Sequence, residues 1–105
     1  MGAMPDLSRV VWPRGRRLVE RSPLAHRLPT LDGKTIAFLW DYVFRGDEIL
    51  PVVERELARR FRSVKFVPWD AFGSIYGGEE RRTIDALPAR LRQHGVDAVV
   101  SAVGC

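Results

Sequence analysis

The chain has 105 residues, of which 46% are hydrophobic and 29% charged, and its formal net charge is +4 at pH 7. This length allows one domain, and the composition is that of an ordinary soluble protein rather than a disordered or fibrous one. Its apolar runs are well short of the roughly 20 residues that a membrane-spanning helix needs, so no association with a membrane is predicted.

The positive charge is concentrated near the start of the chain. Residues 1–33 hold six arginines and three acidic side chains, whereas residues 34–105 hold eleven basic and ten acidic ones. Basic residues in this second part mostly alternate with acids, a pattern typical of a solvated helix face. We therefore do not expect nucleic acid among the partners.

Residues 1–33 are predicted to form an extended arm that is rich in proline and arginine. Four of the seven prolines lie there, and the apolar residues show no sustained periodicity. Proline fixes its own φ and restricts the residue before it, which disfavours regular helix. Within the arm, Val10, Val11 and Trp12 are expected to form either a short strand or an anchoring contact.

Residues 34–105 are predicted to form an α/β domain in which strands and helices alternate. Runs of apolar and β-branched residues predict strands over residues 35–40, 64–69 and 98–105, the first and last of them buried. A first helix is expected after a cap at Asp47, and Pro88 divides or kinks the second. The apolar residues of the two helices repeat at helical spacing: Ile49, Val52, Val53 and Leu57, then Ile84, Leu87 and Leu91.

The alternating order predicts a parallel sheet, because crossovers of this length join parallel strands in a right-handed sense. We predict a three-stranded, Rossmann-like (flavodoxin-like) half-sheet of strand order 2-1-3, with helices on both faces. Such an incomplete domain has an open sheet edge, which needs cover from a second protein chain or from another copy of this one.

The carboxyl ends of the three predicted strands lie at one edge of the sheet, where open α/β sheets bind their ligands. A small-molecule substrate is expected there. The candidate substrate-binding residues are Asp41, Tyr42 and Arg45 after the first strand, and Trp69 and Asp70 after the second. Arg45 is the best of these for holding an anionic group. The alternative is that the aromatic residues cover the core and the aspartates serve turns.

The glycine-bearing loop over residues 71–78 adds the aromatic side chains Phe72 and Tyr76 to the same edge, and Cys105 follows the third strand. The Cys105 sulfur is a candidate catalytic thiol, with a metal ligand, a redox thiol and a small inert side chain as alternatives. Neither histidine has a partner at ligand spacing, so no metal site is predicted. A single cysteine cannot form an internal disulfide, which favours a cytoplasmic location.

Three stretches of the sequence, residues 31–36, 39–48 and 95–105, resemble the UGSC-motif family. That family is named for a selenocysteine-Gly-Ser-Cys motif, which many members carry as Cys-Gly-Ser-Cys. The motif follows a valine-glycine strand end similar to Val103-Gly104. Cys105 aligns either with the residue before the motif or with the first residue of the motif.

The resemblance implies a thiol/selenol-dependent oxidoreductase, in which a thiolate or selenolate attacks and a neighbouring cysteine resolves the intermediate. The family's motif would follow Cys105, so this chain is expected to be an amino-terminal portion that is truncated before its redox motif and inactive alone. No cofactor is expected within the chain, but a selenocysteine codon directly after Cys105 could have been read as a stop. Two alternatives remain: a non-catalytic small subunit of a heteromeric enzyme, and a small-molecule binding module.

Overall fold

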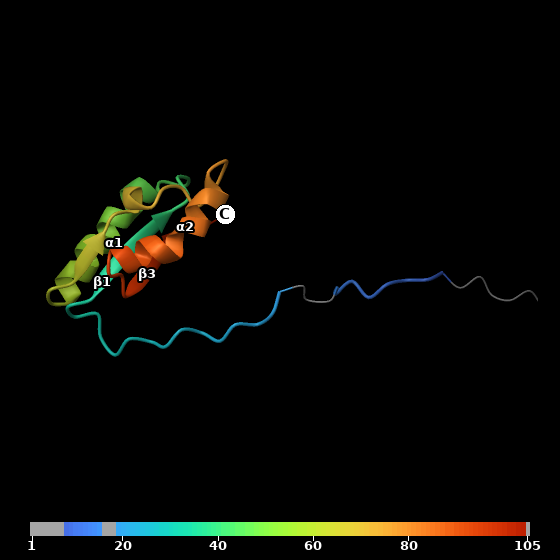
Figure 1. Ribbon diagram of the computed structural model, residues 1–105, viewed down its shortest axis with the longest axis horizontal. Coiled ribbons are helices and arrows are strands. Elements are labelled where there is room, and N and C mark those ends of the chain that lie inside the picture. The colour runs from blue at the N-terminus through green and yellow to red at the C-terminus, as the bar shows by residue number, and fades with distance from the viewer. Residues whose placement is uncertain (1–7, 16–18, 105) are drawn as a thin grey trace, which may run out of the picture.

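The computed structural model describes residues 8–15 and 19–104, which form an extended arm followed by an α/β body (Figure 1). Every described residue from Ser8 to Thr30 is exposed, and none of them belongs to a helix or a strand. The body begins with a turn at Asp32 and Gly33, where the Gly33 amide donates a hydrogen bond to the Arg62 carbonyl. The structure therefore shows no regular secondary structure in the described residues of the arm, which was predicted to be extended.

The body alternates strands and helices in the predicted order. Its elements are β1 (Thr35–Trp40), α1 (Gly46–Arg60), β2 (Lys65–Val67), the 3₁₀ helix η1 (Trp69–Ala71), α2 (Glu80–Gln93) and β3 (Ala98–Ala102). Both strand pairs are parallel, and the strand order is β2-β1-β3. The predicted fold, a parallel half-sheet of order 2-1-3 with two helices, is confirmed.

The two helices cover opposite faces of the sheet, with β1 between them (Figure 1). On one face, Leu50 of α1 packs with Phe38 and Trp40. On the other face, Leu87 and Leu91 of α2 contribute to a second cluster. The buried residues of that cluster are Ala37, Leu39 and Phe72. Residues of β1 alternate between the two clusters, as the side chains of a central strand must.

β3 differs from the buried strand that the sequence predicted. Val100 and Ala102 pack against the cluster on the α1 side, but Val99 is 42% exposed and Ser101 is also exposed. The reason is that the core-facing leucines of α2 pack over β1, which leaves the α2 side of β3 uncovered. For the same reason Ile84 of α2 is exposed, although its spacing placed it with the buried residues.

Two boundaries also differ from the prediction, and a third feature decides between its alternatives. β2 ends at Val67, because Pro68 has no amide to continue the ladder, and Trp69 therefore lies in η1. Helix α1 starts at Gly46 after a left-handed Arg45, and Asp47 is in its first turn instead of capping it. Helix α2 continues through Pro88 as a single helix, so Pro88 does not divide it.

Candidate functional site

The carboxyl edge of the sheet carries a cluster of three aromatic rings, which we call the aromatic cluster: Trp40, Tyr42 and Trp69. Tyr42 stacks on Trp40 with ring centroids 4.6 Å apart. Trp69 meets both rings edge-on, with its centroid 4.8 Å from that of Trp40 and 5.2 Å from that of Tyr42. Trp40 is buried and Tyr42 is 42% exposed, so the cluster extends from the core to the surface. Tyr42 and Trp69, predicted at one site from separate loops, are thus brought together.

The loop from β1 to α1 is bent sharply against this cluster. Tyr42, Phe44 and Arg45 all have positive φ values, of 64°, 58° and 58°. Left-handed backbone costs a residue other than glycine roughly 1 kcal/mol, so neighbouring contacts must hold the loop in place. One such contact is the indole Nε1–H of Trp40, which donates to the Val43 carbonyl at 2.9 Å. Gly46 adds another, because its Cα lies so close to the indole that a side chain there would overlap it.

Asp41 connects the loops that follow β1 and β3. Its Oδ1 accepts hydrogen bonds from the backbone amides of Val103, at 3.1 Å, and of Val43, at 3.4 Å. The Asp41 amide donates to the Ala102 carbonyl at 3.1 Å. The carboxylate that was expected to bind substrate thus holds the segment after β3 beside the loop that carries Tyr42 and Arg45.

The other two predicted polar residues lie on the surface. Arg45 immediately precedes α1, with its side chain 84% exposed and its Nη1 3.8 Å from Glu48 Oε2. This contact is long, so the guanidinium remains accessible to an anion. Asp70 is exposed on η1. Cys105, the predicted catalytic residue, lies outside the described residues, which end at Gly104.

The second loop contributes less to the edge than the sequence suggested. Phe72 is 2% exposed and belongs to the core, where it also meets the ring of His94. Ser74 forms an isolated parallel β-bridge with Trp40. Its hydroxyl also anchors its own loop, because it donates to the Tyr76 carbonyl and accepts from the Tyr76 amide. The packing of the Trp40 indole against Gly46 could not be predicted from the sequence, since it depends on the close approach of α1 to β1.

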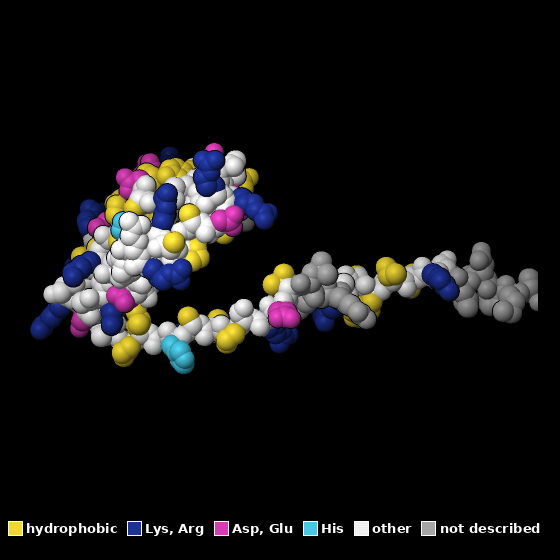
Figure 2. Space-filling view, in the orientation of Figure 1, with side chains coloured by type: hydrophobic (Ala, Val, Ile, Leu, Met, Phe, Trp, Pro, Cys, Tyr) yellow, Lys and Arg dark blue, Asp and Glu magenta, His cyan; other side chains and the backbone are white. Residues whose placement is uncertain are grey.

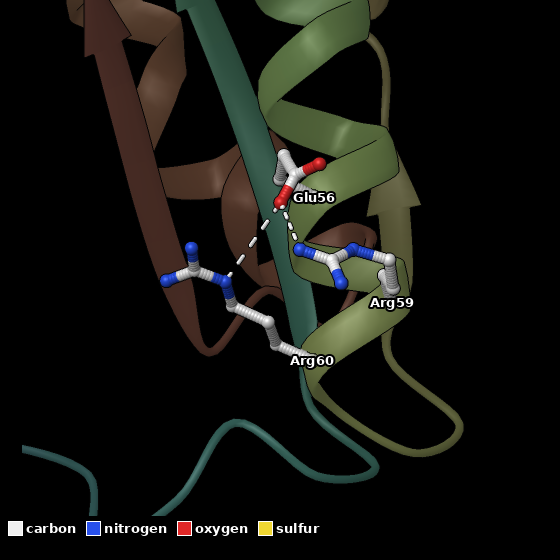
Figure 3. A network of polar contacts seen from close by, with 3 residues as sticks. All are labelled: Glu56, Arg59 and Arg60. Carbon is white, nitrogen blue, oxygen red and sulfur yellow. Dashed lines mark hydrogen bonds and ion pairs between the residues drawn. The ribbon is translucent and has the colours of Figure 1, made fainter.

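Two hollows lie beside helices and not over the aromatic cluster. One, of about 420 Å³, is lined by residues of the loop before α2 and of its first turns: Gly77, Gly78, Glu80, Arg81, Ile84 and Asp85. The other, of about 230 Å³, runs along α1 and is lined by Val52, Val53, Glu56, Leu57 and Arg60. Figure 3 shows Glu56 of this second hollow between Arg59 and Arg60, with its Oε2 2.9 Å and 3.9 Å from their nitrogens.

Within residues 8–15 and 19–104, no group of three His, Cys, Asp or Glu side chains is arranged to hold a metal ion. The described helices also include none that is long and apolar enough to cross a membrane.

Comparison with known families assigns the chain. The family model of the UGSC family matches residues 9–105, almost the whole sequence. The chain belongs to the UGSC family. No curated protein and no solved structure matches it. The resemblance in the three quoted stretches is therefore confirmed, and as a member of the UGSC family the protein carries its aromatic cluster and Asp41 within the matched region.

Proposed function

We propose that this UGSC-family protein takes part in thiol/selenol redox chemistry, with Cys105 as its reactive sulfur and a small-molecule disulfide as the co-reactant. The observation that carries the proposal is the hydrogen bond from the Val103 amide to Asp41. Only Gly104 separates Val103 from Cys105 in the sequence, so we expect the sulfur to lie near the loop that carries Tyr42 and Arg45.

The proposed step is thiol–disulfide exchange. The Cys105 thiolate attacks one sulfur of the small disulfide, a new S–S bond forms to Cys105, and the original S–S bond breaks. The departing thiolate takes a proton from water, so electrons and atoms balance. A second thiol or selenol, from the protein or from solution, then attacks the mixed disulfide and releases Cys105.

The described residues of the carboxyl edge favour a disulfide with an anionic substituent. The Arg45 guanidinium is a cation at this edge, and at 3.8 Å its ion pair to Glu48 leaves it accessible to another anion. The half-exposed Tyr42 ring offers an apolar surface next to it. An exposed ion pair contributes about 0.2–1 kcal/mol, so a preference of roughly 1.4- to fivefold for an anionic disulfide is expected.

The test compares three small disulfides of similar size, one anionic, one neutral and one cationic. Mixed-disulfide formation is followed by intact-mass spectrometry, and the single cysteine makes the modified site unambiguous. We expect the anionic disulfide to react fastest and the Arg45→Gln variant to lose this preference. Arg59→Gln is the matched control, because Arg59 is an exposed arginine near the other end of the same helix.

Equal rates for the three disulfides would contradict the proposal, as would a Cys105 pKa at or above the ordinary thiol value of about 8.5. The pKa is measured from the pH dependence of alkylation by a neutral reagent. A preference that persists in Arg45→Gln would remove Arg45 from the proposal without removing the thiol chemistry.

The prediction of a selenocysteine directly after Cys105 is separate from this proposal. The nucleotide sequence of the gene tests it. A UGA codon after the Cys105 codon, followed in frame by codons for Gly-Ser-Cys, agrees with the prediction. Any other arrangement contradicts it.

A further inference from the structure

The outer edge of β3 has no strand partner among the residues that the structure describes. β3 pairs with β1 along one side, from Ile36↔Ala98 to Trp40↔Ala102. Val99 and Ser101 project to the α2 side of the sheet and are exposed there. An unpaired strand edge presents backbone N–H and C=O groups that can pair with another extended segment.

The hollow at the start of α2 is lined in part by Ile84. Arg90 donates from Nη1 to the Ala71 carbonyl, which places the Arg90 flank of α2 toward η1. Ile84 is about 120° around the helix from Arg90, with the core-facing Leu87 between them. Ile84 is therefore on the flank opposite Arg90, and we infer that this flank faces the uncovered side of β3. We call Ile84, Glu80, Asp85 and Val99 together the acceptor surface.

The arm carries a segment with the complementary character. Val10, Val11 and Trp12 are 88%, 90% and 73% exposed, and Figure 2 shows hydrophobic and basic side chains along the arm away from the body. Arg9 and Arg14 flank this apolar run. Valine and tryptophan favour extended strands, and Pro13 limits the run to a short one.

We propose that residues 9–14 of one copy dock on the acceptor surface of a second copy, so that two copies exchange arms. The apolar run would pair with the edge of β3 and cover Ile84 and Val99. The flanking arginines would face Glu80 and Asp85. Among the residues that line this hollow, these two carboxylates outnumber the single guanidinium of Arg81. The same docked arrangement therefore pairs the apolar residues of the arm with those of the acceptor surface and the basic residues with the acidic ones.

A second copy is the occupant that the structure favours, because Val10, Val11 and Trp12 are not buried by their own body. An extended tether from Gly33 to Trp12 spans up to about 70 Å, which is enough to reach a neighbouring body. Reciprocal exchange uses both arms and both edges, so the assembly closes as a dimer and does not continue as a chain.

The test is sedimentation of the full chain over a concentration series. The wild type is expected to show a monomer–dimer equilibrium. Val11→Lys in the arm and Ile84→Lys on the acceptor surface should each raise the dissociation constant by about tenfold or more. Val52→Lys on α1 is the matched control for Ile84→Lys, because Val52, at 47%, is about as exposed as Ile84, at 45%, and lies away from the acceptor surface. Arg14→Glu, in the extended arm, tests the charge contacts without touching the body.

Mixing the two variants distinguishes arms that are exchanged between copies from an arm that folds back on its own body. A Val11→Lys copy keeps an intact acceptor surface, and an Ile84→Lys copy keeps an intact arm, so the mixture should dimerise more tightly than either variant alone. A wild type that stays monomeric overturns the proposal. This holds also for a monomer whose arm amides are protected from hydrogen exchange, because the arm has then folded back on its own body. A dimer whose affinity is unchanged by Val11→Lys and Ile84→Lys overturns it too. None of these results depends on Cys105, so the proposed redox function is tested separately.

Discussion

Replacing Gly46 with alanine gives a sharp test of how α1 is seated on the sheet. Alanine normally stabilises a helix by about 1 kcal/mol relative to glycine, so helix propensity alone predicts a gain. At this position the added Cβ would overlap the Nε1, Cδ1 and Cε2 atoms of the Trp40 indole. The indole can move only by giving up its stack on Tyr42 and its hydrogen bond to the Val43 carbonyl.

The size of the loss follows from these two contacts. Inserting a methyl group into a well-packed site costs about 1–3 kcal/mol, and a lost hydrogen bond adds roughly 1 kcal/mol. After the helix-propensity gain is subtracted, Gly46→Ala should lower the free energy of unfolding by about 1–3 kcal/mol. This is a large share of the roughly 4–10 kcal/mol expected for a body of about 70 residues.

The assay is urea unfolding followed by far-ultraviolet circular dichroism. Gly78→Ala is the matched control, because nothing lies within 4 Å of a Cβ at Gly78, and its effect should stay within about 0.5 kcal/mol. Gly46→Ala should cost clearly less in a Trp40→Phe background, where the smaller ring leaves space for the methyl group. An unchanged or higher stability of Gly46→Ala, or an equal cost in both backgrounds, would refute the reasoning.

Three further predictions concern the loops and the surface. Asp41→Ala should destabilise the body by about 1–2 kcal/mol and speed hydrogen exchange at the Val103 amide, whereas the exposed Asp70→Ala should change neither; equal effects would contradict the linking role of Asp41. Arg45→Gly should raise the free energy of unfolding by about 0.5–1 kcal/mol, measured by urea unfolding, because glycine adopts the left-handed backbone without strain. Glu56→Gln should change stability by less than about 0.5 kcal/mol despite its contacts with two arginines (Figure 3), since exposed ion pairs contribute little; a larger loss would show a stronger network.

The central strand could be predicted closely from the sequence, because β1 is covered on both faces and its residues are therefore apolar without interruption. The strand order also followed from the sequence, since crossover lengths and handedness leave few alternatives. It was harder to predict which side of α1 faces the sheet. Leu50 is the buried hydrophobic residue of that helix, whereas Ile49 and Val52 are exposed, and a run of neighbouring apolar residues does not reveal which one faces the sheet.

The candidate site shows the same limit. Proximity of Tyr42 to Trp69 followed from the parallel topology, which brings strand ends together. The left-handed loop over residues 42–45 could not be predicted, because Tyr42, Phe44 and Arg45 are not residues that normally signal such a backbone. The exposure of Val99 was missed because an apolar run indicates a strand but not whether a helix covers it.

The most direct test of the account is the ratio of two rate constants at Cys105, for an anionic and for a neutral disulfide. In the wild type we expect a ratio of about 1.4 to 5, and in Arg45→Gln a ratio close to one, because the guanidinium beside the aromatic cluster would select the charged reagent. A wild-type ratio of one would rule out this selection.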